Sequence, residues 1–484
     1  MDTPGFISDA AKRNQLDMQR KGIVIAGLSG GSGKSVVAVG IVAALARRGK
    51  TVVPFKKGPD YIDAGWLQLA AGRKCYNLDP YLMTPEAIVD SFARRSVAAD
   101  VVIVEGNRGL FDGVNVDGGY STADLALALG LPVVLVVDCT KTTRTIAALV
   151  LGCQKFDEEL DIRGVVLNRI ATERQRLLIT EAVEKYTGIP VLGAVPRLKR
   201  DIFPMRHLGM IPHQEYGDSD EALAYLADLV EGSIDLDKLE ALMVPLAGSS
   251  QADGEGQVVG QPSVKIGVLQ DAAFQFYYSE NLEALERQGA SLVYINAMQD
   301  AALPDIDGLY IGGGFPETGA RQLAANTAFR QSVKAAADHG LPVYAECGGL
   351  IYLGTSIVMG GEEFPLAGVF PVRFGMAKKP QAHGYSTFLV DRENSFYNLG
   401  EEVKGHEFRY SKIIDWQGTD DQLALQMVRG TGFMNGRDGL VYKNVLALYT
   451  HVHADGTSQW AEKFVERCRI TKKDRMVEGL ILPS

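Results

Sequence analysis

The chain has 484 residues, of which 46 % are hydrophobic and 22 % are charged, and its formal net charge is −10. This length exceeds what one hydrophobic core usually organises, so we expect two or three domains. The acidic balance and the lack of a basic run argue against nucleic acid as a partner. No stretch reaches the roughly eighteen unbroken apolar residues of a membrane span, and the first twenty residues lack a signal-peptide core.

The cysteines indicate the redox environment. There are five, and none belongs to a Cys-x-x-Cys pair: Cys75, Cys139, Cys153, Cys347 and Cys468. An odd, scattered set favours reduced thiols over disulfides or a zinc site. We therefore expect a cytoplasmic protein without a membrane partner.

From residue 22 to about residue 230, short β-branched runs alternate with helical stretches. The predicted strands are 22–28, 51–55, 101–105, 132–138, 163–168 and 190–195, and the clearest helices are 35–48 and 172–186. Alternation of this kind is typical of a mostly parallel sheet with helices on both faces.

A glycine-rich turn joins the first predicted strand to the first helix. It comprises Ser29, Gly30, Gly31, Ser32, Gly33, Lys34 and Ser35. Backbone N–H groups of such a turn point at phosphate oxygens, and a helix N-terminus lies behind them. Lys34 would neutralise the β- and γ-phosphates, and the Ser35 hydroxyl would contact Mg²⁺. Leu28 stands where the usual motif has glycine, so this is a variant of the phosphate-binding loop.

Charged residues follow the neighbouring strands. Asp60 and Glu105 each come just after an apolar run, where a carboxylate can hold Mg²⁺ beside phosphate. Lys56, Lys57 and Arg108 could attract a polycarboxylate substrate, although such side chains are more often solvated surface charges.

Residues 247–257 are small, polar and glycine-rich, which is typical of a flexible linker. The α/β pattern then resumes, and after residue 380 it gives way to shorter strands. The predicted elements are strands 264–269, 291–295, 307–311, 342–346, 401–410 and 439–450, and helices 280–288, 323–338 and 457–470. We therefore predict a tail at 1–20, an ATP-binding domain at 21–245, a linker at 246–262 and a second domain at 263–484.

Cys347 ends an apolar strand and precedes two glycines and a helical pattern, a tight turn that suits a nucleophile. His451, after another apolar strand, is the candidate base. Backbone donors for an oxyanion could come from Gly348 and from the turn that contains Gly314. Class I glutaminases usually carry Glu two residues after this histidine, whereas this chain has His453. Which group orients His451, and whether His453 shares the base role, stays open.

The chain resembles the cobyrinate a,c-diamide synthase family, which is related to cobyric acid synthase and dethiobiotin synthetase. The resemblance rests on the phosphate loop, the Cys347 turn and residues 55–66, 105–113, 195–197, 206–209, 271–278, 312–317 and 405–411. It implies an N-terminal P-loop domain with a dethiobiotin-synthetase-like parallel sheet. It also implies a C-terminal class I glutamine amidotransferase-like α/β domain. His406 lies in one of these motifs, where a structural role is as good an expectation as a chemical one.

The resemblance implies a glutamine-fuelled amidoligase whose cofactors are ATP and Mg²⁺. The enzyme would phosphorylate the a and c acetate groups of a tetrapyrrole, and ammonia released at Cys347 would displace the phosphate. Carried over residue by residue, the implied Mg²⁺ ligands are Ser35, Asp60 and Glu105, and the adenine contact is Asn168. Tyr61, Asp63 and Asp112 would face the carboxylate being activated.

Alternatives remain at this point. Many cobyrinate-amidating relatives have a Val-Met pair where this chain has Asn107 and Arg108. A His is common in them where this chain has Arg409. Sirohaem or nickel-sirohydrochlorin could therefore be the macrocycle. A partition-type P-loop ATPase switch would have Lys at the position of Ser29 and no use for Cys347. A tetrapyrrole-binding protein with inactive sites would not need intact reactive residues. A homodimer stays open.

Overall fold

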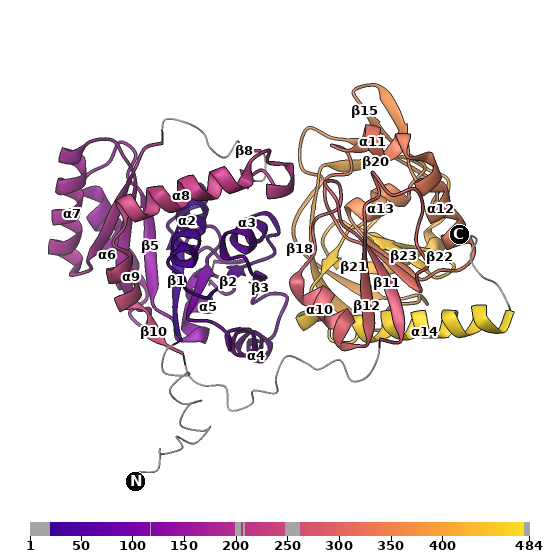
Figure 1. Cartoon of the computed structure of the whole chain (residues 1–484), viewed down its shortest axis with the longest axis horizontal. Helices are drawn as coiled ribbons and strands as arrows, with labels where there is room; N and C mark the ends of the chain where they lie inside the picture. The colour runs from indigo at the N-terminus through magenta and orange to yellow at the C-terminus, as the bar shows by residue number, and fades with distance from the viewer. Residues whose placement is uncertain (1–19, 117, 199–204, 207–208, 247–261, 479–484) are drawn as a thin grey trace, which may run out of the picture. The chain divides into compact units, whose positions relative to one another are not determined.

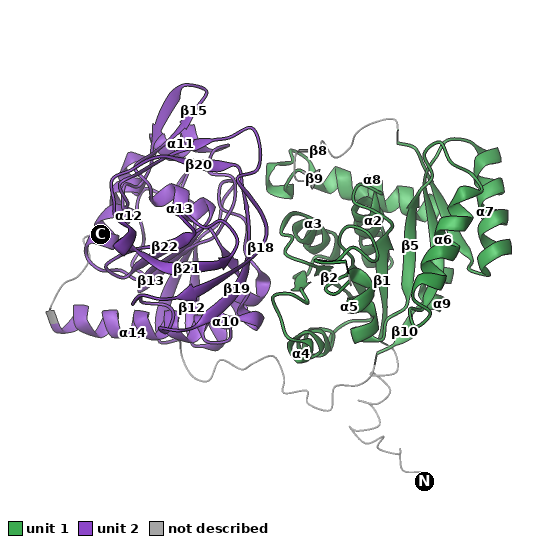
Figure 2. Ribbon diagram, turned by 180° about the vertical axis from the view of Figure 1, so that it is seen from behind, with its two compact units in different colours: residues 1–252 green, residues 253–484 purple. Residues whose placement is uncertain are grey.

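The computed structural model describes residues 20–116, 118–198, 205–206, 209–246 and 262–478. The predicted tail at 1–20, except for Arg20, and most of the predicted linker lie outside the described residues. The chain divides into two compact units, Met1–Ala252 and Asp253–Ser484 (Figure 2). Among the described residues, no helix combines the length and the apolar character needed to cross a membrane.

Unit 1 is built on a sheet in the strand order β3-β2-β4-β1-β5-β6-β7, and every neighbouring pair on this path is parallel. The strands are β1 (Lys21–Gly27), β2 (Val52–Lys57), β3 (Tyr76–Leu78), β4 (Val101–Glu105), β5 (Val133–Asp138), β6 (Ile162–Ile170) and β7 (Val191–Pro196). The short β10 (Val244–Pro245) pairs antiparallel with the start of β1, and β8 (Met205–Arg206) pairs with β9 (Gly209–Met210). The buried central strands read as continuous β-branched runs, as expected for a sheet covered on both faces.

Helices connect these strands (Figure 1). They are α2 (Lys34–Arg47), α3 (Ile62–Ala71), α4 (Pro85–Arg95), α5 (Thr122–Leu129), α6 (Thr145–Phe156), α7 (Glu173–Thr187), α8 (Ser219–Ser233) and α9 (Leu236–Leu242). Helix α2 packs against α3 and α8, while α4 contacts α5 and α6 contacts α7. Because parallel crossovers are right-handed, these two groups of helices cover opposite faces of the sheet. Because β1, β4 and β2 are parallel neighbours, their carboxyl ends lie side by side at the same end of the sheet.

Unit 2 contains a ten-stranded sheet in the order β12-β11-β13-β14-β23-β22-β21-β18-β19-β24. Its strands are β11 (Val264–Leu269), β12 (Ala290–Ile295), β13 (Gly308–Ile311), β14 (Val343–Glu346), β18 (Ala382–Val390), β19 (Glu402–Arg409), β21 (Leu423–Arg429), β22 (Arg437–Tyr442), β23 (Val445–Leu448) and β24 (His451–Val452). The pairs from β12 to β23 are parallel, and those from β23 to β24 are antiparallel. A second sheet joins β16 (Glu362–Pro365), β15 (Ser356–Met359), β17 (Val372–Met376) and β20 (Ser411–Trp416).

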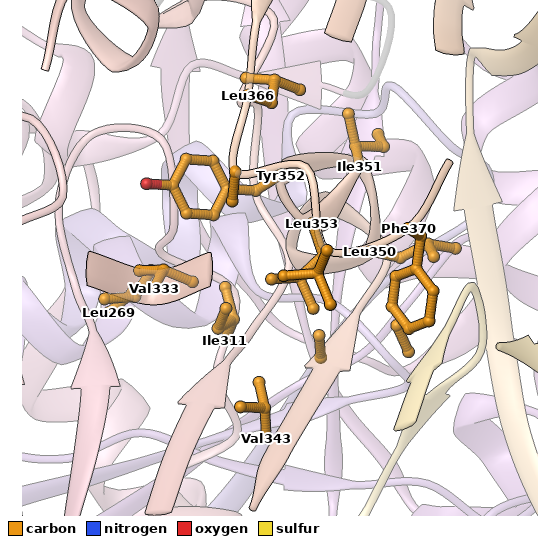
Figure 3. Close-up of a cluster of buried hydrophobic side chains, with 14 of the residues drawn as sticks. Leu269, Ile311, Val333, Val343, Leu350, Ile351, Tyr352, Leu353, Leu366 and Phe370 are labelled. Carbon is orange, nitrogen blue, oxygen red and sulfur yellow. The ribbon is translucent and has the colours of Figure 1, made fainter. Parts of the chain in front are cut away.

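Two hydrophobic cores flank the large sheet of unit 2. One includes residues of α11 (Ala320–Ala325), α12 (Thr327–Asp338) and α13 (Gly348–Leu353), and Figure 3 shows Leu350 to Leu353 of α13 beside Ile311 and Val343. The other includes residues of α10 (Ser279–Arg287) and α14 (Trp460–Glu478). Strand alternation divides β13 between them, because Ile311 faces the first core and Tyr310 faces the second.

The predicted fold class is confirmed: both units are α/β, and the strands of unit 1 lie within two residues of their predicted ends at most positions. Two predictions for unit 2 are wrong, because one predicted helix is two helices and one predicted strand is two strands. The helix 323–338 breaks at Asn326, whose side chain accepts a hydrogen bond from Phe329 N and begins α12 anew. The strand 439–450 is the β22–β23 hairpin, since Lys443 turns with a φ of 50°.

Phe464 offers a test of the second core. Its fully buried ring lies 5.1 Å from the Phe396 ring and 6.2 Å from the Tyr344 ring, measured between centroids. We expect Phe464→Ala to lower the free energy of unfolding of unit 2 by about 3–5 kcal/mol, because it removes an aromatic side chain and leaves a cavity. Urea denaturation followed by tryptophan fluorescence would measure this loss. Ile470→Ala, on the same helix but 40 % exposed, is the control, and an equal loss there would contradict the assignment.

Candidate active sites

The glycine-rich turn of unit 1 takes the conformation that its sequence predicts. It links β1 to α2, and both Gly31 (φ 76°) and Gly33 (φ 83°) adopt left-handed backbone angles that favour glycine. A Cβ atom on Gly33 would lie 2.1 Å from Nδ2 of Asn168. That amide donates a hydrogen bond of 2.8 Å to the Ser32 carbonyl. Asn168, at the carboxyl end of β6, thus braces the phosphate loop.

Two lysines and two carboxylates converge beside this turn. Lys34 hydrogen-bonds Glu105, and Lys56 Nζ lies 2.7 Å from Asp63 Oδ2 and 3.0 Å from Glu105 Oε1. The Ser35 hydroxyl lies 2.7 Å from Glu105 Oε1 and 2.8 Å from Asp63 Oδ2. The structure therefore brings Ser35 and Glu105 together as predicted and adds Asp63 and Lys56 to them.

Asp60 occupies a different position. Its Oδ1 accepts a hydrogen bond of 2.9 Å from Asp63 N, and its Oδ2 lies 3.8 Å from Lys56 Nζ. Asp60 thus lies just before α3, accepts a hydrogen bond from its first turn, and reaches the cluster through Lys56.

Burial and charge set the protonation of this cluster. Burial alone would lower the pKa of Lys56, but the carboxylates of Asp63, Glu105 and Asp60 outweigh it and raise that pKa well above its ordinary value. Burial lowers the pKa of Lys34, which is only partly offset by Glu105. For Asp63, Lys56 and Lys34 outweigh burial and bring the pKa down to about 2. Lys56 and Asp63 therefore form a charged pair at neutral pH.

The solvated-surface interpretation of the basic residues is wrong for two of the three. Lys56 is fully buried and Lys57 is 5 % exposed, whereas Arg108 is exposed. Burial lowers the pKa of Lys57. Lysine is almost never fully buried unless it is paired, so the burial of Lys56 depends on carboxylates that only the fold brings beside it.

The residues expected to face the activated carboxylate lie on two segments near the cluster. Tyr61 is the residue before α3, and Asp63 is in its first turn. Asp112 lies on the loop after β4, is exposed, and accepts a hydrogen bond of 2.8 Å from Gly109 N.

The oxygen donors fit Mg²⁺. Glu105 is fully buried, yet its Oε2 accepts no hydrogen bond within the described part of the chain. No group of three or more His, Cys, Asp or Glu side chains in the described ranges is arranged to hold a metal by itself. Mg²⁺ usually takes one or two carboxylates and completes its shell with water and phosphate oxygens. Ser35, Glu105 and Asp63 offer such a partial set.

The thiol of unit 2 lies on a strained turn. Cys347 joins β14 to α13 with a φ of 47°, a backbone conformation that residues other than glycine rarely adopt. Its N–H donates to the Leu448 carbonyl at 2.8 Å, and its Sγ lies 3.7 Å from the Phe408 carbonyl oxygen. Cys347 is 6 % exposed, so neighbouring strands hold the thiol in place.

His451 hydrogen-bonds Cys347, as the sequence predicts for a nucleophile and its base. Its Nδ1 lies 3.3 Å from Oε2 of Glu346, a residue that sequence analysis did not select. Burial alone would lower the pKa of His451, but Cys347 and Glu346 outweigh it and raise the pKa to about 10. The signal that could have revealed Glu346 is a carboxylate within an apolar strand, directly before the cysteine.

Two further histidines, His406 and His453, lie in this region of unit 2. His406 stacks on the His451 ring with 4.9 Å between centroids. Burial, together with the charge of His451 and His453, holds the pKa of His406 well below its usual range. His453 accepts a hydrogen bond from Asp455 N at 3.2 Å, and its Nε2 lies 3.7 Å from Glu280 Oε1. These contacts direct His453 toward Glu280.

Glycines allow the backbone to approach the Cys347–His451 pair. A Cβ atom on Gly348 would lie 3.0 Å from Gly314 N, and one on Gly313 would lie 2.4 Å from Cε1 of His451. The structure thus brings Gly314 and Gly348 together, as expected for two sources of backbone donors.

Comparison with known proteins defines the class. Residues 23–208 match the family model described as a CobQ/CobB/MinD/ParA nucleotide binding domain. Residues 265–459 match the model of a CobB/CobQ-like glutamine amidotransferase domain. The protein is therefore a carbon–nitrogen ligase that combines nucleotide binding with glutamine as the amido donor.

The relatives define the family. A cobyrinate a,c-diamide synthase of Magnetococcus marinus is 41 % identical over 89 % of this chain and 93 % of its own length. The enzyme of the same name from Archaeoglobus fulgidus is 40 % identical over 93 % of this chain and 98 % of its own. The chain belongs to the cobyrinate a,c-diamide synthase family, as the sequence motifs predicted.

Gly313 provides a test of the thiol site. We expect Gly313→Ala to displace the His451 ring, because the new methyl group would overlap it. Alkylation of Cys347 by iodoacetamide at neutral pH should then slow by about 10²-fold, the cost of misplacing a catalytic group by about 1 Å. Gly152→Ala is the control, since Gly152 lies within helix α6, its backbone is not left-handed, and no atom lies within 4 Å of its added Cβ. Unchanged Cys347 reactivity in folded Gly313→Ala protein would show that the base is not held at this position.

Proposed function

We propose that this enzyme amidates the a and c acetate side chains of a tetrapyrrole, with a cobyrinate-type corrinoid as the first candidate. The observation that carries the proposal is the presence in one chain of two clusters of reactive side chains that suit the two half-reactions. Unit 1 has a phosphate loop beside buried carboxylates, and unit 2 has a cysteine hydrogen-bonded to a histidine. The names of the relatives support the choice of substrate.

A carboxylate resists amidation because its leaving group would be oxide. In the proposed reaction, a carboxylate oxygen attacks the γ-phosphorus of ATP, and ADP leaves. Ammonia then attacks the acyl carbon of the resulting acyl phosphate, phosphate leaves, and the amide nitrogen gives up a proton. Each acetate amidated thus consumes one ATP and one glutamine.

In unit 1, the protein would stabilise the charge on the transferred phosphoryl group. The N–H groups of Gly30, Gly31, Ser32 and Gly33 and the ammonium group of Lys34 would contact the phosphates. Mg²⁺, held by Ser35 and Glu105 with Asp63 and Asp60 close by, would supply further positive charge when bound. Asn168 would keep the loop in place and contact adenine, and Tyr61 and Asp112 would orient the acetate group.

In unit 2, His451 would take the proton of Cys347, and the thiolate would attack the amide carbon of glutamine. The carbonyl oxygen becomes an oxyanion, which the N–H groups of Gly348 and Gly314 would stabilise. Ammonia leaves with the proton from His451, and water hydrolyses the γ-glutamyl thioester. We propose a cytoplasmic location, because all five cysteines are free and reduced thiols persist there. The domain boundaries, 21–245 and 263–484, and assembly as a homodimer are also part of this proposal.

Mass spectrometry with ATP, Mg²⁺ and glutamine tests the reaction. Cobyrinate, sirohaem and nickel-sirohydrochlorin would be offered in parallel, and we expect cobyrinate to lose about one mass unit per amidation, twice. The exposed Arg108 beside Asn107 makes the other two macrocycles the second candidates. Amidation of one of them instead would change the substrate but keep the chemistry, and failure on all three would contradict the proposal.

Cys347→Ser separates the two sites. We expect it to abolish glutamine-dependent amidation, because an alcohol at this position is a far weaker nucleophile than a thiolate. Amidation with ammonium chloride in place of glutamine should proceed at the rate of the parent enzyme, since unit 1 is unchanged. Loss of both activities in folded protein would count against a separate ammonia source.

Glu105→Gln tests the phosphoryl-transfer site. We expect ammonia-dependent ATP turnover to fall by about 10²–10³-fold, because the variant removes charge that holds Lys34, Lys56 and Mg²⁺ in place. Asp228→Asn is the control, since this carboxylate is 71 % exposed and pairs with Arg47, the last residue of α2. Equal turnover in both variants would contradict the placement of the site.

A further inference from the structure

The Glu346 carboxylate is buried beside the ring nitrogen of His451. Its Oε2 lies 3.3 Å from His451 Nδ1 and 3.4 Å from the Tyr310 hydroxyl. Its Oε1 accepts a hydrogen bond of 3.3 Å from Val452 N. The side chain is 1 % exposed. Both carboxylate oxygens are therefore engaged, and the group is fixed relative to the strand that carries the histidine.

Strand geometry explains how two consecutive residues reach one imidazole. Alternation along β14 directs Tyr344 to the core beside α14, whereas Ala345 and Cys347 contribute to the core beside α13. Glu346 follows Tyr344 to its face, where Tyr310 donates to it. His451 comes three residues after Leu448, the partner of Glu346 in the β14–β23 pairing, and lies between the carboxylate and the thiol.

We propose that Glu346 is the positioning residue of the glutaminase site and supplies the carboxylate that this chain lacks two residues after His451. By accepting from Nδ1–H, it would hold the tautomer in which Nε2 takes the thiol proton, and it would stabilise the imidazolium that forms. A base oriented by a third group is the general arrangement for an activated nucleophile. The inference rests on the proposed glutaminase function.

Contacts direct the two neighbouring histidines away from this role. His453 stands at the position of the usual glutamate, but its ring contacts Asp455 N and Tyr278 and faces Glu280. His406 lies face to face with His451, a stacking that leaves the in-plane nitrogens pointing elsewhere, and its Nδ1 lies 3.3 Å from the Tyr278 hydroxyl.

Three titratable groups lie against His451 and bear on its pH dependence: Glu346 and Cys347 at the end of β14 and His406 from β19. His453, beyond β24, acts on His406. Cys347 and Glu346 raise the pKa of His451, and the two neighbouring histidines lower the pKa of His406 if they are charged. Removing the charge of Glu346 should therefore lower the pKa of His451. The alkaline limb of kcat/KM against pH would move to lower pH.

Glu346→Gln in the full chain tests the role, because glutamine keeps the size of the side chain and an acceptor for Tyr310 and Val452 N. We expect kcat for glutamine hydrolysis to fall by about 10²–10⁴-fold, as when a triad carboxylate becomes an amide, with little change in KM. The alkaline limb should move by about one pH unit or more. Glu346→Asp, which keeps the charge, should recover part of kcat and the parental alkaline limb.

Glu280→Gln is the matched control. Glu280 is fully buried in the same unit, and its carboxylate faces His453, so we expect near-parental hydrolysis and an unchanged pH profile. A loss as large as that of Glu346→Gln would overturn the inference, because any buried carboxylate would then serve. Urea denaturation with the parental transition reports a folded unit 2 in each variant.

Further variants separate failure of this inference from failure of the proposed function. If Cys347→Ala and His451→Ala hydrolyse glutamine as fast as the parent, the glutaminase assignment itself fails. If they are inactive while Glu346→Gln keeps the parental kcat and alkaline limb, the positioning role alone is overturned. Should Glu346→Gln not fold, Glu346→Asp decides, since a parental pH profile with reduced kcat supports the role and a shifted limb contradicts it.

Discussion

A sharp turn from a buried parallel strand into a helix is the constraint on which both sites depend. In unit 1 the turn after β1 contains the glycine-rich phosphate loop, and in unit 2 the turn after β14 carries the buried thiol of Cys347. Each turn needs left-handed backbone, which glycine supplies at Gly31 and Gly33 and which the surrounding strands impose on Cys347. The strand provides rigidity, and the turn provides access.

The two sites manage buried charge differently. In unit 1, two lysines meet carboxylates in a nearly closed cluster, so no single charge is left without a partner of opposite sign. Such balance is what allows ionised groups to be buried beside a loop that receives a polyanion. In unit 2, a single buried histidine lies against one thiol and one carboxylate, which together raise its pKa. In the proposed reactions, the first site would meet charge that arrives with the substrate, and the second would meet charge that forms during the reaction.

Much of this arrangement could be predicted from the sequence, because buried parallel strands read as unbroken β-branched runs and the reactive motifs follow them directly. The small sheet of β15, β16, β17 and β20 was missed, since its strands are four to six residues long and only partly apolar. Asn326 was read as helical because its capping role depends on contacts with Ala297 and Asp300, which are remote in sequence. Lys56, Asp63 and Glu346 acquire their roles only from side chains that the fold brings beside them.

The adjacency of Glu346 and Cys347 also has a consequence for how such a site could arise or be moved. A nucleophile and the carboxylate proposed to assist it are here separated by one peptide bond, so a single short strand-and-turn segment carries both. A recipient sheet would need to offer only a histidine shortly after the next parallel strand and a glycine loop that leaves space for its ring. Inserting or deleting one residue within β14 would reverse the faces of both side chains at once. The carboxylate and the thiol can therefore be moved together to another sheet, and a one-residue shift in the strand would misplace both together.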